Sequence, residues 1–218
     1  MSKSILTGGA ATNQPLSLIY IPGWKLNAGN DDLAFTDTWQ AVLDQVQGLI
    51  EQTDPLSGAG VLTAAVSSNP DIEPKVVVQE LEGLIHSPLE AGLNVGVVGH
   101  SIGGYYAAYI AAKYHLPVVL INPLVKAYSS LLLADMLEDK PDLMALAKTQ
   151  LKELELPCQA DRTMLMLQRG DLLQDYQQAL ESYNDCNQIV LNGGHYSFHN
   201  LQDWLVPVTG FVSRYYDH

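Results

Sequence analysis

Three residues that could perform nucleophilic catalysis each lie in a short glycine-containing segment that follows an apolar run. Ser101 is at the centre of GHSIG, Asp171 ends the stretch QRGD, and His195 ends the stretch LNGGH. A serine hydroxyl is a weak nucleophile until a histidine base, itself oriented by a carboxylate, activates it. The order serine, aspartate, histidine along the chain therefore predicts a nucleophile, its acid partner and its base.

The GHSIG segment is typical of a nucleophile elbow, which is a tight turn between a strand and a helix. Gly99 and Gly103 flank Ser101 at two-residue spacing, where a Cβ atom would collide with the turn or with the adjacent strand. Such a turn holds the serine hydroxyl at the carboxyl end of a parallel sheet, where open α/β folds bind their ligands. A glycine-rich connection without chemistry is the alternative.

Both the acid and the base have a second candidate nearby. Asp175 lies four residues after Asp171, and Asp171 could instead cap the helix that we expect after it. His199 lies four residues after His195. Because catalytic groups in such folds follow strand ends directly, we expect Asp171 and His195 to be the functional pair.

An acyl-transfer site also needs donors for the oxyanion that develops during attack. We expect the backbone N–H groups of Ile102, which follows the nucleophile, and of Trp24, in the loop IYIPGWKLN, to supply them. Gly23 allows this loop to turn. Gly23, Lys25 and His100 are the residues that we expect to line the substrate site, with His100 packed beneath it.

The elements that must position these residues alternate between short apolar runs and amphipathic segments. Continuous β-branched and aliphatic runs indicate strands that are covered on both faces, at 17–21, 61–66, 94–100, 117–122, 163–168 and 187–192. Helical patterns lie between them at 37–52, 73–87, 101–115, 172–184 and 201–216, and we expect Pro207 to bend or break the last. This alternation predicts an α/β fold with a mostly parallel sheet of about six strands and helices on both faces.

One segment, 123–162, interrupts this alternation. It is rich in leucine and methionine, has a break at Lys140-Pro141, and contains no strand pattern. We expect two or three helices here, which form either a small lid over an apolar substrate pocket or a long crossover packed on the sheet. The whole chain, 1–218, is then a single domain with a helical insert.

Composition excludes several classes of function. The net charge is −13 with only 11 lysines and arginines, which disfavours binding to nucleic acid or to an anionic membrane surface. No apolar run is long enough to cross a bilayer, and the first residues lack the apolar core of a secretion signal, so we expect a cytoplasmic protein. Cys158 and Cys186 are expected to be reduced thiols. The motifs require no metal and no cofactor.

The same segments resemble a known family, the small YqiA/YcfP-like α/β-hydrolases described as esterases. The resemblance covers nearly the whole chain, in the stretches YIPGW, VVGHSIGGYYAAYIA, VLINPLVKAY, LQRGDLLQDYQQAL and LNGGHYSFHNLQDW. It implies a compact α/β-hydrolase with a reduced sheet. By matching motif, it implies that Ser101 is the nucleophile, Asp171 the acid, His195 the base, and Trp24 and Ile102 the oxyanion donors.

The chain departs from the family pattern at three places. Pro22-Gly23 stands where the family usually has His-Gly, and the loop before His195 is one residue shorter than usual, which keeps His199 as an alternative base. Lys126 replaces an arginine after the Asn-Pro motif and would hold a charge but form fewer bidentate contacts with a carboxylate.

We therefore expect a serine hydrolase that cleaves a small carboxylic ester through an acyl-enzyme. One alternative is an acyl-CoA thioesterase, for which Lys25, Lys126 and Arg169 would have to form a basic rim for the polyanionic substrate. Another is a non-catalytic binding protein on a hydrolase fold, since a fold does not determine function.

Overall fold

The structure is a computed structural model of the whole chain. It describes residues 14–24, 44, 47–48, 60–64, 66, 69–171, 174–193, 198 and 201–216. Most of the helix predicted at 37–52 lies outside these residues, but Asp44, Gln47 and Gly48 are helical.

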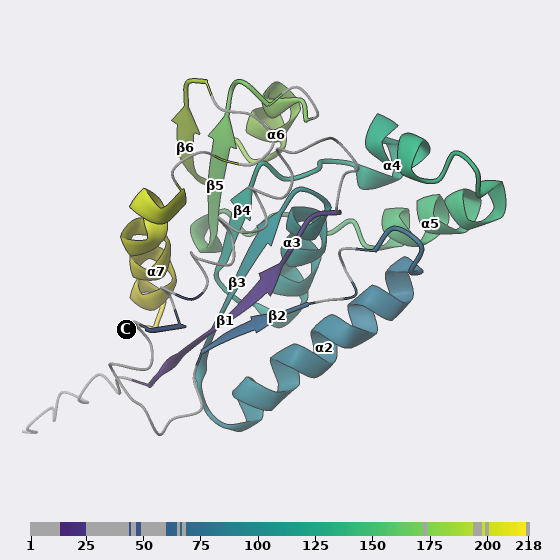
Figure 1. Cartoon of the computed structure of the whole chain (residues 1–218). Helices are drawn as coiled ribbons and strands as arrows, with labels where there is room; N and C mark the ends of the chain where they lie inside the picture. The colour runs from purple at the N-terminus through teal and green to yellow at the C-terminus, as the bar shows by residue number, and fades with distance from the viewer. Residues whose placement is uncertain are drawn as a thin grey trace, which may run out of the picture.

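The core of the fold is a six-stranded sheet in which every pairing is parallel. The strands are β1 (Leu16–Ile21), β2 (Val61–Thr63), β3 (Asn94–His100), β4 (Val118–Ile121), β5 (Thr163–Gln168) and β6 (Asn187–Leu191), in the order β2-β1-β3-β4-β5-β6. This confirms the predicted fold class, an α/β fold with a parallel sheet. Because all strands run the same way, the segments that follow them meet at one edge of the sheet (Figure 1).

Six α-helices and three 3-10 helices are described. The α-helices are α2 (Pro74–Glu90), α3 (Ile102–Tyr114), α4 (Leu131–Met136), α5 (Pro141–Glu153), α6 (Tyr176–Ser182) and α7 (Leu205–Arg214). The 3-10 helices are η2 (Ala127–Ser129), η3 (Ala160–Arg162) and η4 (Leu201–Trp204). Among the described residues, none of these helices has the length and apolar character that spanning a bilayer requires.

The sheet buries apolar side chains on both of its faces. In β1, Ile19 and Ile21 point into a large cluster with α2 and α3, whereas Leu18 and Tyr20 point into a second cluster with α7. Figure 1 shows α7 on the opposite side of the sheet from α2 and α3. Successive side chains of a strand point to opposite faces, so this two-sided burial explains why the inner strands β1, β3, β4 and β5 are largely apolar.

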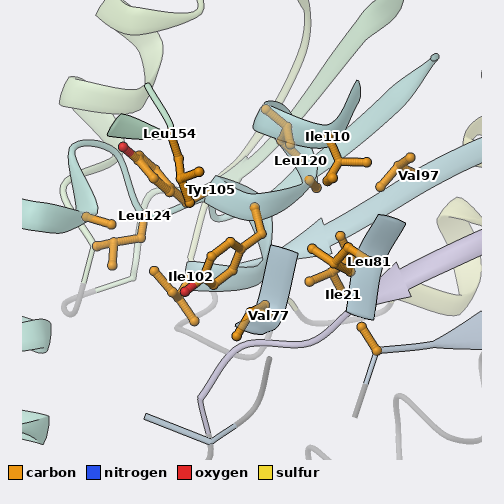
Figure 2. Close-up of a cluster of buried hydrophobic side chains, with 14 of the residues drawn as sticks. Ile21, Val77, Leu81, Val97, Ile102, Tyr105, Ile110, Leu120, Leu124 and Leu154 are labelled. Carbon is orange, nitrogen blue, oxygen red and sulfur yellow. The ribbon is translucent and has the colours of Figure 1, made fainter. Parts of the chain in front are cut away.

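The larger cluster fills the space between the sheet and the helices α2 and α3. Figure 2 shows Val77 and Leu81 of α2 gathered with Ile21 and Val97 of the sheet, beside Ile102 at the start of α3. This packing fixes the first turn of α3 against β1 and β3, which are the strands that precede the predicted oxyanion loop and the predicted nucleophile.

Two predicted boundaries differ from the structure for local reasons. Strand β2 ends at Thr63 rather than at 66, and the backbone N–H of Val66 donates to the carboxylate of Glu80 instead of to a strand. Helix α6 begins at Tyr176 rather than at 172, because the side chain of Asp175 caps it.

The predicted effect of Pro207 was wrong. The chain changes from η4 to α7 at Leu205, before the proline, and Pro207 is the third residue of α7. The N–H groups of a first helical turn have no partner within the helix, so a proline there removes no hydrogen bond.

The segment between β4 and β5 contains η2, α4, α5 and η3. Helix α5 is tied to the start of α2 by polar contacts: the Lys75 backbone N–H donates to Gln150 Oε1 at 3.0 Å, and Gln150 Nε2 donates to Glu73 at 3.2 Å. An exposed ion pair joins Lys75 and Glu153 at 3.3 Å. The buried Gln150 thus anchors α5 to the helical layer that covers the sheet.

Helix α7 approaches β3 closely at Gly96, and this contact yields a stability prediction. A Cβ atom on Gly96 would overlap a methyl group of Val212 and lie 2.9 Å from Leu18 Cδ2. Gly96→Ala should therefore lower the free energy of unfolding by roughly 1 to 3 kcal/mol, measured by urea denaturation. The matched control is Gly83→Ala in α2, where nothing lies within 4 Å and alanine should stabilise by up to about 1 kcal/mol.

Val212→Ala tests whether this overlap is the cause. Combined with Gly96→Ala, it should give a double variant whose loss is smaller than the sum of the single losses by at least about 0.5 kcal/mol. Simple additivity would show that Gly96 matters for another reason.

Candidate active site

Ser101 occupies a strained turn between β3 and α3. Its φ of 55° and ψ of −123° lie outside the regions that residues with a side chain normally adopt. Three backbone hydrogen bonds hold it there: Ser101 N–H donates to Ile121 O at 3.1 Å, and Ser101 O accepts from the N–H groups of Gly104 and Leu124, both at 2.9 Å. The conformation is thus held from the neighbouring strand β4, the loop after it and the first turn of α3.

The glycine at position 103 is required by the approach of another backbone. A Cβ atom there would overlap the carbonyl oxygen of Ile21 and lie 2.5 Å from that of Pro22. Gly99 is equally enclosed, since its Cβ would lie 2.5 Å from both the Gly103 carbonyl oxygen and Ala107 Cβ. The glycines of GHSIG therefore stand where side chains cannot fit, as the sequence predicted.

This contact brings the loop after β1 beside the Ser101 turn. Residues Pro22 to Trp24 follow β1 directly, and Trp24 is buried in the larger apolar cluster. Trp24 and Ile102 therefore belong to neighbouring segments at the carboxyl edge of the sheet. Lys25 lies outside the described residues.

The loops after β4 and β5 are joined through a buried asparagine. Asn122 has a φ of 39°, its backbone N–H donates to Met166 O at 2.9 Å, and its Oδ1 accepts from the N–H of Gln168 at 2.9 Å. Asn122 is the first residue of the Asn-Pro motif. It fixes the end of β5, from which the chain proceeds to Asp171.

The two candidate acids have different environments. Asp171 is 5% exposed, and its Oδ1 accepts from the backbone N–H of Gln174 at 3.2 Å. Asp175 is exposed and caps α6 by accepting from the N–H groups of Gln177 at 3.0 Å and Gln178 at 3.4 Å. The capping role considered for Asp171 thus belongs to Asp175.

The sequence did not identify Gln174, which contacts the serine directly. Its Nε2 donates to Ser101 Oγ at 2.7 Å, and the side chain is only 6% exposed. Its Oε1 has no hydrogen-bond partner among the described residues. Gln174 lies three residues after Asp171 in a segment that we predicted as ordinary helix, and nothing in its local sequence distinguishes it from Gln177 or Gln178.

Two buried residues complete the described part of the site. Ser101 has no exposed surface, and its hydroxyl is in contact with the amide of Gln174. His100, at the end of β3, is also fully buried, and its place in the substrate site stays a prediction.

The segment that leads to His195 runs alongside the Asp171 loop. The N–H of Arg169 donates to Leu191 O at 3.0 Å, and the N–H of Gly170 donates to Gly193 O at 2.9 Å. These bonds bring the residues before Asp171 next to the residues that follow β6. His195 and His199 themselves lie outside the described residues.

The first turns of α3 contribute tyrosines that stay neutral. Burial raises the pKa of both Tyr105 and Tyr106 well above the usual value, and Tyr105 Oη donates to Leu151 O at 2.8 Å. Neither phenol can therefore act as a base near neutral pH. Within the part of the chain that the structure describes, no group of three His, Cys, Asp or Glu side chains could hold a metal ion.

The architecture matches solved structures of esterases and lipolytic enzymes. The metagenome-derived lipolytic enzymes LipS and LipT are represented by a chain with 12% identity and a TM-score of 0.63, over 92% of this chain and 94% of that one. Carboxyl esterase 2 of the fungus Tuber melanosporum has 15% identity and a TM-score of 0.58, over 94% and 79%. An esterase of Pyrobaculum calidifontis has 17% identity and a TM-score of 0.56, over 94% and 78%. The chain therefore has the α/β-hydrolase fold.

A family model extends this likeness to the sequence. The model of an uncharacterised protein family, UPF0227, matches residues 58–213, which include the Ser101 turn, the Asp171 loop and the segment of His195. The chain therefore belongs to UPF0227, the YqiA/YcfP family that its motifs resemble.

Proposed function

We propose that the protein is a serine hydrolase that cleaves small carboxylic esters through an acyl-enzyme. The observation that carries this proposal is the strained turn at Ser101, whose flanking glycines are required by close contacts and which lies between the carboxyl end of β3 and the start of α3. Backbone strain of this kind costs of order 1 to 3 kcal/mol and is found mainly at functional sites. The esterases that share the fold support the same reaction class.

In the proposed mechanism, Ser101 Oγ attacks the acyl carbon while His195 takes the hydroxyl proton. The electron pair of the carbonyl bond moves to oxygen, and the N–H groups of Ile102 and Trp24 stabilise this oxyanion. The oxyanion collapses, and His195 returns the proton to the departing alcohol. Water, deprotonated by His195, then attacks the acyl-enzyme and releases the acid and Ser101.

Asp171 is the acid that we propose for this triad. It is buried, and its backbone lies beside the strand end that leads to His195, through the Gly170 to Gly193 hydrogen bond. A buried carboxylate at this position would hold the imidazole in the tautomer that accepts the serine proton. Asp175 is committed to the cap of α6, which leaves its carboxylate directed at backbone N–H groups.

The helical insert shapes a pocket next to the nucleophile helix. This pocket has a volume of about 460 Å³ and lies between α3, the residues Val125 and Lys126, and the stretch 154–158 after α5. Tyr105, one helical turn after Ser101, is part of its wall. None of Ser101, Asp171 and Gln174 lines this pocket, which extends along α3 to Cys158 and Tyr183, so we propose that the insert packs on the helical layer, with α5 held in place by Gln150.

A fluorophosphonate probe should form a single covalent adduct on Ser101, because the probe reports an activated serine. Intact mass and peptide mapping measure the adduct, and Ser101→Ala should abolish it. Asp171→Asn and His195→Ala should slow labelling by roughly 100-fold or more, because base catalysis is lost. Their matched controls, Asp175→Asn and His199→Ala, should label at nearly the wild-type rate.

Absence of an adduct in folded wild-type protein would contradict the hydrolase proposal and favour a binding protein on the same fold. If Asp175→Asn or His199→Ala abolished labelling while the Asp171 or His195 variant did not, the assignment of the triad would be wrong.

The hydrogen bond from Gln174 restrains Ser101 in the resting site. A change at Gln174, unlike the changes to the triad, should therefore raise the labelling rate. Attack uses a lone pair of Ser101 Oγ, so the hydrogen bond from Gln174 stabilises the ground state more than the transition state. Gln174→Ala removes this hydrogen bond and most of the side chain that lies against Ser101. The hydrogen bond from the backbone N–H of residue 174 to Asp171 Oδ1 is retained. We expect the labelling rate to rise about fivefold, the equivalent of one ordinary hydrogen bond.

Gln178→Ala, at an exposed position of α6, is the control and should leave the rate unchanged. A lower rate in folded Gln174→Ala protein would instead mean that the amide holds Oγ in the productive rotamer.

A further inference from the structure

Two cysteines meet at the end of the sheet opposite the candidate site. Cys158 lies in the loop between α5 and β5, and Cys186 directly precedes β6. Their Sγ atoms are 3.0 Å apart, and both thiols are free. The register of the two strands explains this proximity: Met164 pairs with Asn187, so Cys186 is adjacent to Thr163, whose Oγ1 lies 3.4 Å from Cys158 Sγ.

The two sulfurs are chemically unequal. The hydrogen bond from the Cys186 thiol lowers the pKa of Cys158 to about 7, against the opposing effects of burial and of the carboxylates of Asp161 and Asp185. The same bond raises the pKa of Cys186. Cys158 is therefore the thiol of the pair that loses its proton more readily, and the thiolate is the reactive form of cysteine.

Small reagents can reach this pair from solvent. Cys158 is exposed and Cys186 is partly exposed. Cys158 also lies on the rim of the 460 Å³ pocket, together with Leu156 and Tyr183. Buried structural cysteines, in contrast, are inert because reagents cannot approach them.

We propose that Cys158 and Cys186 are a redox modification site that forms a reversible intramolecular disulfide. With hydrogen peroxide as the oxidant, the Cys158 thiolate attacks a peroxide oxygen, the O–O bond breaks, and a sulfenic acid and hydroxide form. The Cys186 sulfur, giving up its proton, then displaces the second hydroxide from Cys158. The two thiols lose two electrons and two protons, and peroxide becomes two water molecules. A dithiol reductant reverses the change by exchange.

The bond would tie the amino ends of β5 and β6 together. The closed loop, 158–186, contains β5, Asp171, Gln174 and α6, so the crosslink restrains the two strands that lead to the Asp171 loop and to the segment of His195. Closing a loop of this length reduces the freedom of the unfolded chain and stabilises the folded one. The proposal depends only on the two thiols and is independent of the proposed esterase activity.

The test treats the folded native protein with a modest excess of hydrogen peroxide at neutral pH. Intact mass should show the loss of two hydrogen atoms, peptide mapping should link Cys158 to Cys186, and Tm should rise by roughly 5 to 10 °C and fall again with dithiothreitol. Cys186→Ser should stop at a sulfenic acid on Cys158 that dimedone traps, whereas Cys158→Ser should react slowly.

Two results would overturn the proposal. In one, both thiols of the wild-type protein remain free under conditions in which Cys158 of the Cys186→Ser variant is oxidised. In the other, oxidation gives only disulfides between two molecules. If the single variants fail to fold, the wild-type mass and peptide map alone decide, because the linked peptide is either present or absent.

Discussion

The site depends on one backbone contact, the approach of the Ile21 and Pro22 carbonyl groups to Gly103. It joins the end of β1 to the first turn of α3 without any side chain between them. The strained Ser101, the loop that carries Trp24 and the N-terminus of α3 are consequently held at one point of the sheet edge. A larger residue at position 103 would separate these segments and, with them, Ser101 from the oxyanion donors that we propose for it.

The remaining parts of the site reach this point through the parallel register. Asn122 joins the ends of β4 and β5, and Gly170 and Gly193 join the segments that follow β5 and β6. Each of these connections is a hydrogen bond between neighbouring loops, so hydrogen bonds link these loops along the carboxyl edge of the sheet. Gln174 adds to these links by contacting both Ser101, through its side chain, and Asp171, through its backbone.

The sequence predicted the structure best at positions where the fold tolerates only one type of residue. The strands were predictable because both faces of the sheet are buried, and the Ser101 turn was predictable because only glycine fits at 99 and 103. Gln174 was not predictable, because its role arises from the fold, which brings a residue from the start of the α6 segment to the end of β3. The first residue of α6 depends on which side chain caps that helix, and the effect of Pro207 depends on where the first turn of α7 begins. Composition alone determines neither.

The position of β1 in the sheet also affects when the Ser101 turn can form during folding. Strand β1 pairs with β3, some 78 positions later in the chain (Leu16 with Asn94), whereas β3, β4, β5 and β6 pair in sequential order. Pairings between residues distant in sequence close large loops and form slowly. The carbonyl groups that pack on Gly103 belong to this distant strand end and the loop after it. Assembly of the turn is thus linked to the docking of the N-terminal strand, a nonlocal step of folding.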